Sequence, residues 1–165
     1  MKALKTRMIQ LSPSLLVIAL DQITKLAVIR ALRPYDAIPV IPGFFNLVHV
    51  RNPGIAFGLL SRWGTAWSVF LLSALTIAAI ILLLVWFSRL RDDRRTSFGL
   101  SLIIGGAVGN LIDRVRLGEV VDFLDFYVGS FHWPAFNVAD SAVTVGTICL
   151  AFSILFDQSA KKQRI

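Results

Sequence analysis

Two aspartates stand in apolar stretches of the chain, where an isolated carboxylate is costly to ionise. Asp122 lies within the sequence Val-Val-Asp-Phe-Leu at 120–124, and Asp140 precedes a long apolar run from Ala142 to Phe156. Such groups are rare in low-dielectric surroundings unless the protein uses them. Two neighbouring carboxyl groups can share one proton, polarise a carbonyl group and activate water. Asp122 and Asp140 are therefore the candidate catalytic residues.

Each aspartate also has a purely structural explanation. Asn137 is a suitable N-cap residue, and Asp140 stands where a capping box would place its carboxylate, near the positive end of a helix dipole. Asp122 would fit equally well as a solvated loop residue. The residues alone leave both explanations open.

The composition predicts an integral membrane protein. The chain is 56% hydrophobic with a mean hydropathy of +0.71, which is too apolar for a soluble domain. A net charge of +7 would suggest a nucleic-acid partner in a soluble protein. Here the basic residues cluster beside apolar segments, so they indicate membrane orientation instead. Because the single cysteine, Cys149, provides no metal-binding cluster, we expect no metal and no cofactor.

Four apolar segments are long enough to cross a bilayer, and we expect one domain, residues 1–165, to contain them. The first span is interrupted by Asp21 and Lys25, whose i,i+4 spacing lets them pair on one helix face. It lacks a convincing cleavage site, so we expect a retained helix rather than a removed signal. The expected spans are residues 8–29, 63–88, 96–115 and 137–156.

The distribution of basic residues predicts the orientation. Basic residues flank the first span at its start, the connection between the second and third spans, and the end of the fourth. The positive-inside rule then places both termini in the cytoplasm. Asp140 falls at the outer end of the fourth span, and Asp122 falls in the outer loop before it. Two carboxyl groups at the same outer interface favour a shared role over two separate structural ones.

Other segments have default structural interpretations. The first outer loop, residues 31–62, is rich in Pro and Gly, and within it residues 45–52 predict a short strand with 55–60 as a possible partner. The pattern Gly105-Gly106-Ala107-Val108-Gly109 predicts close helix packing. We expect His49 and His132 to lie at the membrane interface. Asp125, like Asp122, has no evident local partner.

Two other classes of function remain open on these features. A small proton-coupled transporter would use intramembrane aspartates as a relay, but it predicts polar residues through the depth of the bilayer. The inner half of every expected span is almost purely apolar. A binding scaffold would use the glycine-rich face and would need no pair of carboxyl groups.

Five segments, in this order, resemble the lipoprotein signal peptidase (signal peptidase II) family. The resemblance extends along nearly the whole chain, from Ser14 to Ala151, and the segments have the spacing typical of that family. One departure is Ile55, where the family often has a small residue beside Gly54. The segments are Asp-Gln-Ile-Thr-Lys at 21–25, Arg-Asn-Pro-Gly-Ile-Ala-Phe at 51–57, Gly-Gly-Ala-Val-Gly-Asn-Leu-Ile-Asp-Arg at 105–114, Val-Val-Asp-Phe at 120–123 and Phe-Asn-Val-Ala-Asp-Ser at 136–141.

The resemblance implies a four-helix membrane protein with a small periplasmic sheet or loop cradle between the first two helices. It implies a bacterial inner-membrane aspartic endopeptidase, acting as a monomer, that cuts prolipoproteins before a diacylglyceryl-modified cysteine. Asp122 and Asp140 would be the catalytic dyad at the outer face. The residues implied to line, order or support the site are Asn52, Gly54, Asn110, Arg114, Asn137, Asp21 and Lys25.

Overall fold

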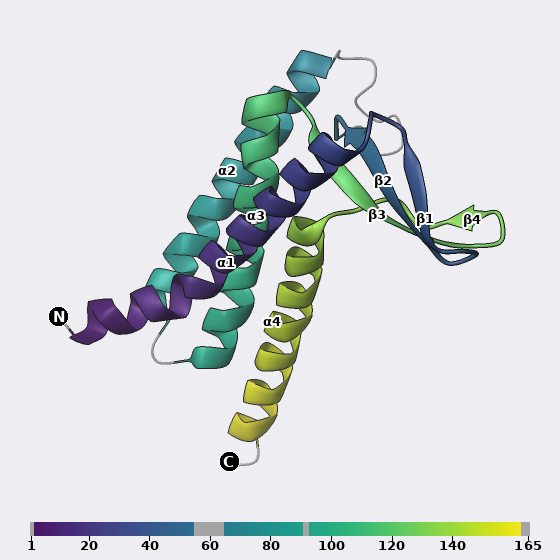
Figure 1. Cartoon of the computed structure of the whole chain (residues 1–165). Helices are drawn as coiled ribbons and strands as arrows, with labels where there is room; N and C mark the ends of the chain where they lie inside the picture. Colours follow the sequence, from purple (N-terminus) through teal and green to yellow (C-terminus); the bar gives the residue numbers. More distant parts are fainter. Residues whose placement is uncertain (1, 55–64, 91–92, 163–165) are drawn as a thin grey trace.

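The computed structural model describes residues 2–54, 65–90 and 93–162 (Figure 1). Four long helices form a bundle, and strands from two of the connections form a small sheet at one end of it. In chain order the elements are α1 (Lys2–Ala31), β1 (Ala37–Ile41), β2 (Phe45–Asn52), α2 (Thr65–Arg89), α3 (Arg94–Leu117), β3 (Val120–Val128), β4 (Phe131–His132) and α4 (Val138–Lys162).

The four expected spans are confirmed. Each helix contains a segment that is long and apolar enough to cross a membrane, namely Thr6–Ala31, Ala66–Arg89, Arg94–Leu117 and Val138–Phe156. Half of the most apolar window of α3 is buried, against 6% for α2, so α3 is the central helix and α2 is largely left to contact lipid. α2 is the most apolar of the four spans, whereas α3 carries the small and polar residues that neighbouring helices contact.

The glycines of α3 permit the close helix packing that the sequence predicts. A Cβ atom on Gly105 would lie 2.9 Å from the Cα atom of Ser14 in α1. A Cβ atom on Gly106 would overlap the carbonyl oxygen of Ala139 in α4. Because only glycine allows these backbones to approach so closely, α3 holds α1 and α4 together at the level of Asp140.

The sheet has the strand order β1-β2-β3-β4, and every pairing is antiparallel. The expected strand at 45–52 is confirmed as β2. Its observed partners are β1 and β3, while the suggested partner at 55–60 lies outside the described residues. The sheet therefore combines strands from the first connection with strands from the connection between α3 and α4.

Asp122 lies in strand β3, so the expectation of an irregular loop there is wrong. The sequence pattern does not predict this strand, because Val120 to Phe123 are buried on both faces and lack the alternation of a half-buried strand. Val121 and Phe123 pack with Val28 and Leu32 at the end of α1, which forms the core beneath the sheet.

The sheet and the two chain termini lie at opposite ends of the bundle (Figure 1). The C-terminal ends of α1 and α3 and the N-terminal ends of α2 and α4 therefore share the sheet end. This arrangement brings Asn52, Asn110, Asp122 and Asp140, which are far apart in the sequence, to one place.

Candidate active site

Asp122 is a buried carboxyl group held by two side-chain amides. It lies opposite Val50 in the pairing of β2 with β3, and its exposure is 2%. Asn52 donates a hydrogen bond to Asp122 Oδ2 at 2.9 Å, and Asn137 donates one to Oδ1 at 2.7 Å. The Oδ1 atom of Asn52 accepts the Gly54 N–H at 2.8 Å, which directs the Asn52 amide group toward Asp122. Gly54 has a φ of 78°, a conformation that favours glycine.

Asp140 lies in the first turn of α4, and its backbone N–H donates to Asn137 Oδ1 at 2.9 Å. Asp140 Oδ2 in return accepts the Asn137 N–H at 3.3 Å. The capping box proposed from the sequence is therefore present. Asn110 donates to the other oxygen, Asp140 Oδ1, at 2.7 Å. The structural role and a chemical role of Asp140 are thus compatible.

Asn137 connects the two carboxyl groups. Its side chain donates to Asp122 while its backbone N–H donates to Asp140, and the whole residue is buried. A carboxyl group from a strand and one from a helix are thereby held to the same residue. The side-chain partners of Asp122 and Asp140 are amides from distant segments rather than nearby cations, so they do not show in the sequence around either aspartate.

A buried ion cluster orients the side chain of Asn110. Lys25 Nζ lies 2.9 Å from Asp21 Oδ2 and 2.9 Å from Asp113 Oδ2, and it donates to Asn110 Oδ1 at 3.0 Å. An ammonium group can only donate, so the oxygen of Asn110 must face Lys25 and its NH₂ group must face Asp140. The i,i+4 pair of Asp21 and Lys25 is confirmed.

The same cluster ties α1 to the sheet end of α3 and α4. Asp21 Oδ1 accepts the backbone N–H of Ala139 at 2.9 Å, and Asp113 Oδ2 accepts that of Val121 at 3.2 Å. These two residues adjoin Asp140 and Asp122 in the chain. The cluster therefore fixes the backbone on which each candidate catalytic carboxyl group is carried.

Both candidate carboxyl groups line one cavity of about 440 Å³. A second groove, of about 420 Å³, begins at Asp140 and Arg114 and continues between α2, α3 and α4 over apolar side chains, among them Leu72, Leu83 and Ile103. Asp140 is thus reached from the sheet side and from the lipid side. The cavity is lined by Asn52, Asp122, Trp133, Pro134, Ala135, Phe136, Asp140, Ser141 and Thr144.

The surroundings of Asp122 raise its pKa to about 6. Burial is the main cause, because it penalises the charged form, and the negative charge of Asp140 acts in the same direction. The hydrogen bonds from Asn52 and Asn137 and the charge of Lys25 oppose the increase. A carboxyl group with this pKa can be protonated or ionised near neutral pH, as a general acid or base requires.

Some partners could not be foreseen from the sequence. Asp113 pairs with Lys25 across the helix interface, although the opposite charge of Arg114 is next to it in the sequence. His49 was expected at the membrane interface, yet it is 1% exposed, with its Nδ1 atom 2.9 Å from the carbonyl oxygen of Leu32. Asp125 is bonded to Asn46 and His132 rather than unpartnered. Sequence spacing identifies partners on one helix, whereas these pairs depend on how separate elements pack.

Four membrane-spanning helices that hold two carboxyl groups against one cavity define an integral membrane protein suited to acid–base chemistry at one end of its bundle. The family model described as "Signal peptidase (SPase) II" matches residues 14–156. The chain therefore belongs to the signal peptidase II family.

Similar proteins agree with this assignment. The lipoprotein signal peptidase of Desulforapulum autotrophicum is 49% identical over 146 residues, covering 88% of this chain and 90% of that protein. The one from Geobacter metallireducens is 50% identical over 142 residues, covering 86% of each. A solved bacterial membrane enzyme matches with a TM-score of 0.80 and 35% identity, covering 92% of this chain and 90% of that one.

Family membership confirms the function expected from the sequence. The chain is an aspartic-type peptidase with a signal peptidase II function, and it is a multi-pass protein of the bacterial inner membrane. The transporter and scaffold alternatives are thereby set aside.

Proposed function

We propose that Asp122 and Asp140 are the catalytic dyad, which cleaves a prolipoprotein immediately before a diacylglyceryl-modified cysteine. The observation that carries this assignment is the bridge formed by Asn137, which binds both carboxyl groups where they face one cavity. Asn52, Gly54, Asn110, Asn137, Asp21 and Lys25 are positioning residues, through the contacts described above.

The dyad shares one proton between its two members. The ionised carboxylate takes a proton from water, whose oxygen adds to the scissile carbonyl carbon while the protonated carboxyl group gives its proton to the carbonyl oxygen. The resulting tetrahedral intermediate loses the amine of the cysteine, which receives a proton from the dyad. The acid and the base are both carboxyl groups of this chain, so the reaction needs no metal or cofactor.

The groove between α2, α3 and α4 supports a lipid-anchored substrate. Its lining is mostly apolar, and it ends at Asp140 and Arg114. Acyl chains in this groove would hold the modified cysteine at the depth of the dyad, so that positioning contributes to the rate. Arg114 lies at the head of the groove, where it would contact the polar part of the lipid. Ile55, the departure from the family pattern, lies outside the described residues.

We propose that both termini are cytoplasmic and that the site faces the periplasm. The basic residues that flank the helices are concentrated at the end of the bundle that carries the termini, and the dyad lies at the other end. We also propose that one chain works alone, as a single domain of residues 1–165, because both carboxyl groups and the cavity belong to one chain.

Replacement of each carboxyl group tests the dyad. With a purified diacylated prolipoprotein, Asp122→Asn and Asp140→Asn should each lower the cleavage rate by at least about 100-fold, because neither variant retains an acid–base pair. Asp125→Asn is the matched control, since Asp125 lies on the same strand but is bonded to Asn46 and His132. Near-normal turnover by either dyad variant, or equal loss in the control, would contradict the assignment.

A further inference from the structure

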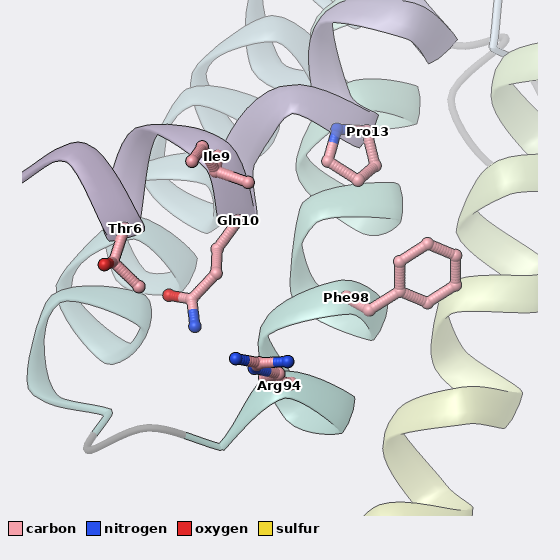
Figure 2. Close-up of a pocket in the computed structure, with 6 residues that line it drawn as sticks. All are labelled: Thr6, Ile9, Gln10, Pro13, Arg94 and Phe98. Carbon is pink, nitrogen blue, oxygen red and sulfur yellow. The ribbon is translucent and has the colours of Figure 1, made fainter.

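A second cavity lies at the end of the bundle opposite the sheet, between the first turns of α1 and α3. Its volume is about 410 Å³, within the range of roughly 300–1,000 Å³ that is usual for ligand pockets. Thr6, Ile9, Gln10 and Pro13 line it from α1, and Arg94 and Phe98 line it from α3 (Figure 2). None of these residues belongs to the candidate active site.

Pro13 accounts for the opening between the helices. Proline has no N–H group for the carbonyl oxygen of Ile9, and the hydroxyl of Ser12 donates to that oxygen instead at 2.8 Å. On the sheet side of Pro13, α1 packs tightly on α3, where Ser14 contacts Gly105. On the other side, Arg7 donates to the carbonyl oxygen of Ser88 in α2 at 2.6 Å. The first turns of α1 therefore approach α2 and leave a gap beside α3.

The lining of this cavity is amphipathic. Ile9, Pro13 and Phe98 provide apolar surface, while Thr6, Gln10 and Arg94 provide polar groups. Figure 2 shows the Gln10 amide reaching from α1 toward the Arg94 guanidinium of α3. Arg94 is exposed and has no ion-pair partner among the residues that the structure describes. Asp93, beside it, accepts instead from the backbone N–H groups of Arg95 and Thr96.

The charge around this end of the bundle favours an anion. The segments that flank these helix ends in the sequence carry ten of the 17 lysines and arginines against three of the ten acidic residues. Because Asp93 already caps the amides at the start of α3, an anion would be bound by the Arg94 side chain rather than by the helix terminus. In a bilayer, the apolar floor between two spans is reached by acyl chains.

We propose that this cavity binds one anionic phospholipid of the adjacent leaflet. Its phosphate would lie against Arg94 and Gln10, and an acyl chain would lie over Ile9, Pro13 and Phe98. The lipid would fill the gap created at Pro13 and hold the first turns of α1 to α3. The site is separate from the peptidase site, so it is a structural lipid site and not a substrate site.

Native mass spectrometry of the detergent-purified protein tests this proposal. Phosphatidylglycerol and phosphatidylcholine with the same acyl chains are added separately, and the fraction of protein with one bound lipid is measured. We expect phosphatidylglycerol to bind more tightly than phosphatidylcholine. Arg94→Gln should weaken phosphatidylglycerol binding about fivefold, as the loss of one arginine contact predicts. Arg89→Gln, which removes the same charge at the same end outside the cavity lining, should leave binding within about twofold.

A second variant tests the apolar part without changing any charge. Ile9→Trp places a larger side chain, which the membrane interface tolerates, at the mouth of the cavity and should also weaken phosphatidylglycerol binding. Cleavage of prolipoprotein by both variants shows that they are folded.

Three results would overturn the proposal. Equal losses in Arg94→Gln and Arg89→Gln would indicate diffuse surface charge. Equal binding of the two lipids would exclude recognition of net negative charge. Protection against thermal unfolding by inorganic phosphate alone, to the extent given by phosphatidylglycerol, would indicate a phosphate site instead.

Discussion

At the scale of single residues, the two carboxyl groups of the proposed dyad have unequal surroundings. Asp122 lies on a strand, nearly inaccessible, and its pKa is raised to about 6 mainly by burial. Asp140 lies in the first turn of a helix and accepts hydrogen bonds from Asn110 and Asn137. Two carboxyl groups held this close to each other can share one proton. Asn137 holds the two groups in this relation.

The hydrogen bond from Asn52 gives a prediction for the pH dependence. Its amide stabilises ionised Asp122 and so lowers the pKa, which means that Asn52→Ala should raise the Asp122 pKa above about 6. Cleavage requires one proton on the dyad, and that proton is lost as pH rises. The alkaline limb of the kcat/KM profile should therefore move to higher pH, while the maximum rate falls.

Asn46→Ala is the matched control for this shift. Asn46 is on the same strand, and its amide donates to Asp125 Oδ2 at 2.9 Å, as Asn52 donates to Asp122. Its profile should keep the wild-type limbs. A shift of the Asn52→Ala profile toward lower pH would show that the limb does not report Asp122.

At the scale of elements, the packing of α3 determines where the dyad lies. The backbone of Gly106 touches the carbonyl of Ala139, which immediately precedes Asp140. A side chain at Gly106 must move α4, and with it Asp140, relative to the sheet that carries Asp122. The small-residue pattern therefore contributes to the site geometry as well as to helix packing.

Gly106→Ala should lower both stability and activity. Overpacking at this contact should lower the free energy of unfolding by about 1–3 kcal/mol. The cleavage rate per folded molecule should also fall, because the added side chain displaces Asp140 relative to Asp122. Thermal unfolding measures the loss of stability, and the cleavage rate of the folded fraction measures the loss of activity. Val115→Ala, on the same helix but 74% exposed, is the control. Normal turnover in Gly106→Ala would show that α4 does not depend on this contact.

The elements that could be predicted from the sequence are those with a clear pattern of length, hydropathy or residue type. The spans could be predicted because α2 and its neighbours are long and apolar, and β2 because it is β-branched and bounded by turns. Strand β3 could not, since Asp122 and its neighbours are covered on both faces. The polar network could be predicted only where spacing defines it, as for Asp21 and Lys25. The bonds of Lys25 to Asp113 and of Asn137 to Asp122 exist only after the elements pack.

At the scale of the whole molecule, the cavity that contains the proposed dyad and the proposed lipid groove meet at Asp140. The groove reaches Asp140 from the membrane, and the cavity reaches it from the sheet side. A substrate anchored by acyl chains can occupy both at once, whereas a free peptide can occupy only the cavity.

Removing the lipid from the substrate should therefore slow cleavage strongly. We expect kcat/KM for an unlipidated prolipoprotein of the same sequence to be at least about 100-fold lower, because the positioning supplied by the anchor is lost. The measurement compares both precursors in the same detergent. Equal cleavage of the two would contradict lipid-directed positioning without affecting the assignment of the dyad.

The orientation of the molecule gives an independent prediction. Reporter fusions should place the two termini and Arg89 on the cytoplasmic side, and Tyr35 and His132 on the periplasmic side. The reason is the concentration of basic residues at the end of the bundle that carries the termini. A periplasmic C-terminus would contradict the proposed topology.

The pairing of β2 with β3 has a consequence for biogenesis. Asn52 and Val120 are opposite each other in the sheet, and α2 and α3 lie between them in the chain. The two strands can meet only when both helices have crossed the membrane and the chain has returned to the starting side. The hydrogen bond from Asn52 to Asp122 can therefore form only in a correctly inserted chain. In a nascent or misinserted chain the active site is not assembled. Moving the basic residues to invert α3 should leave a chain that accumulates but cuts nothing, and cleavage by such a chain would refute this dependence.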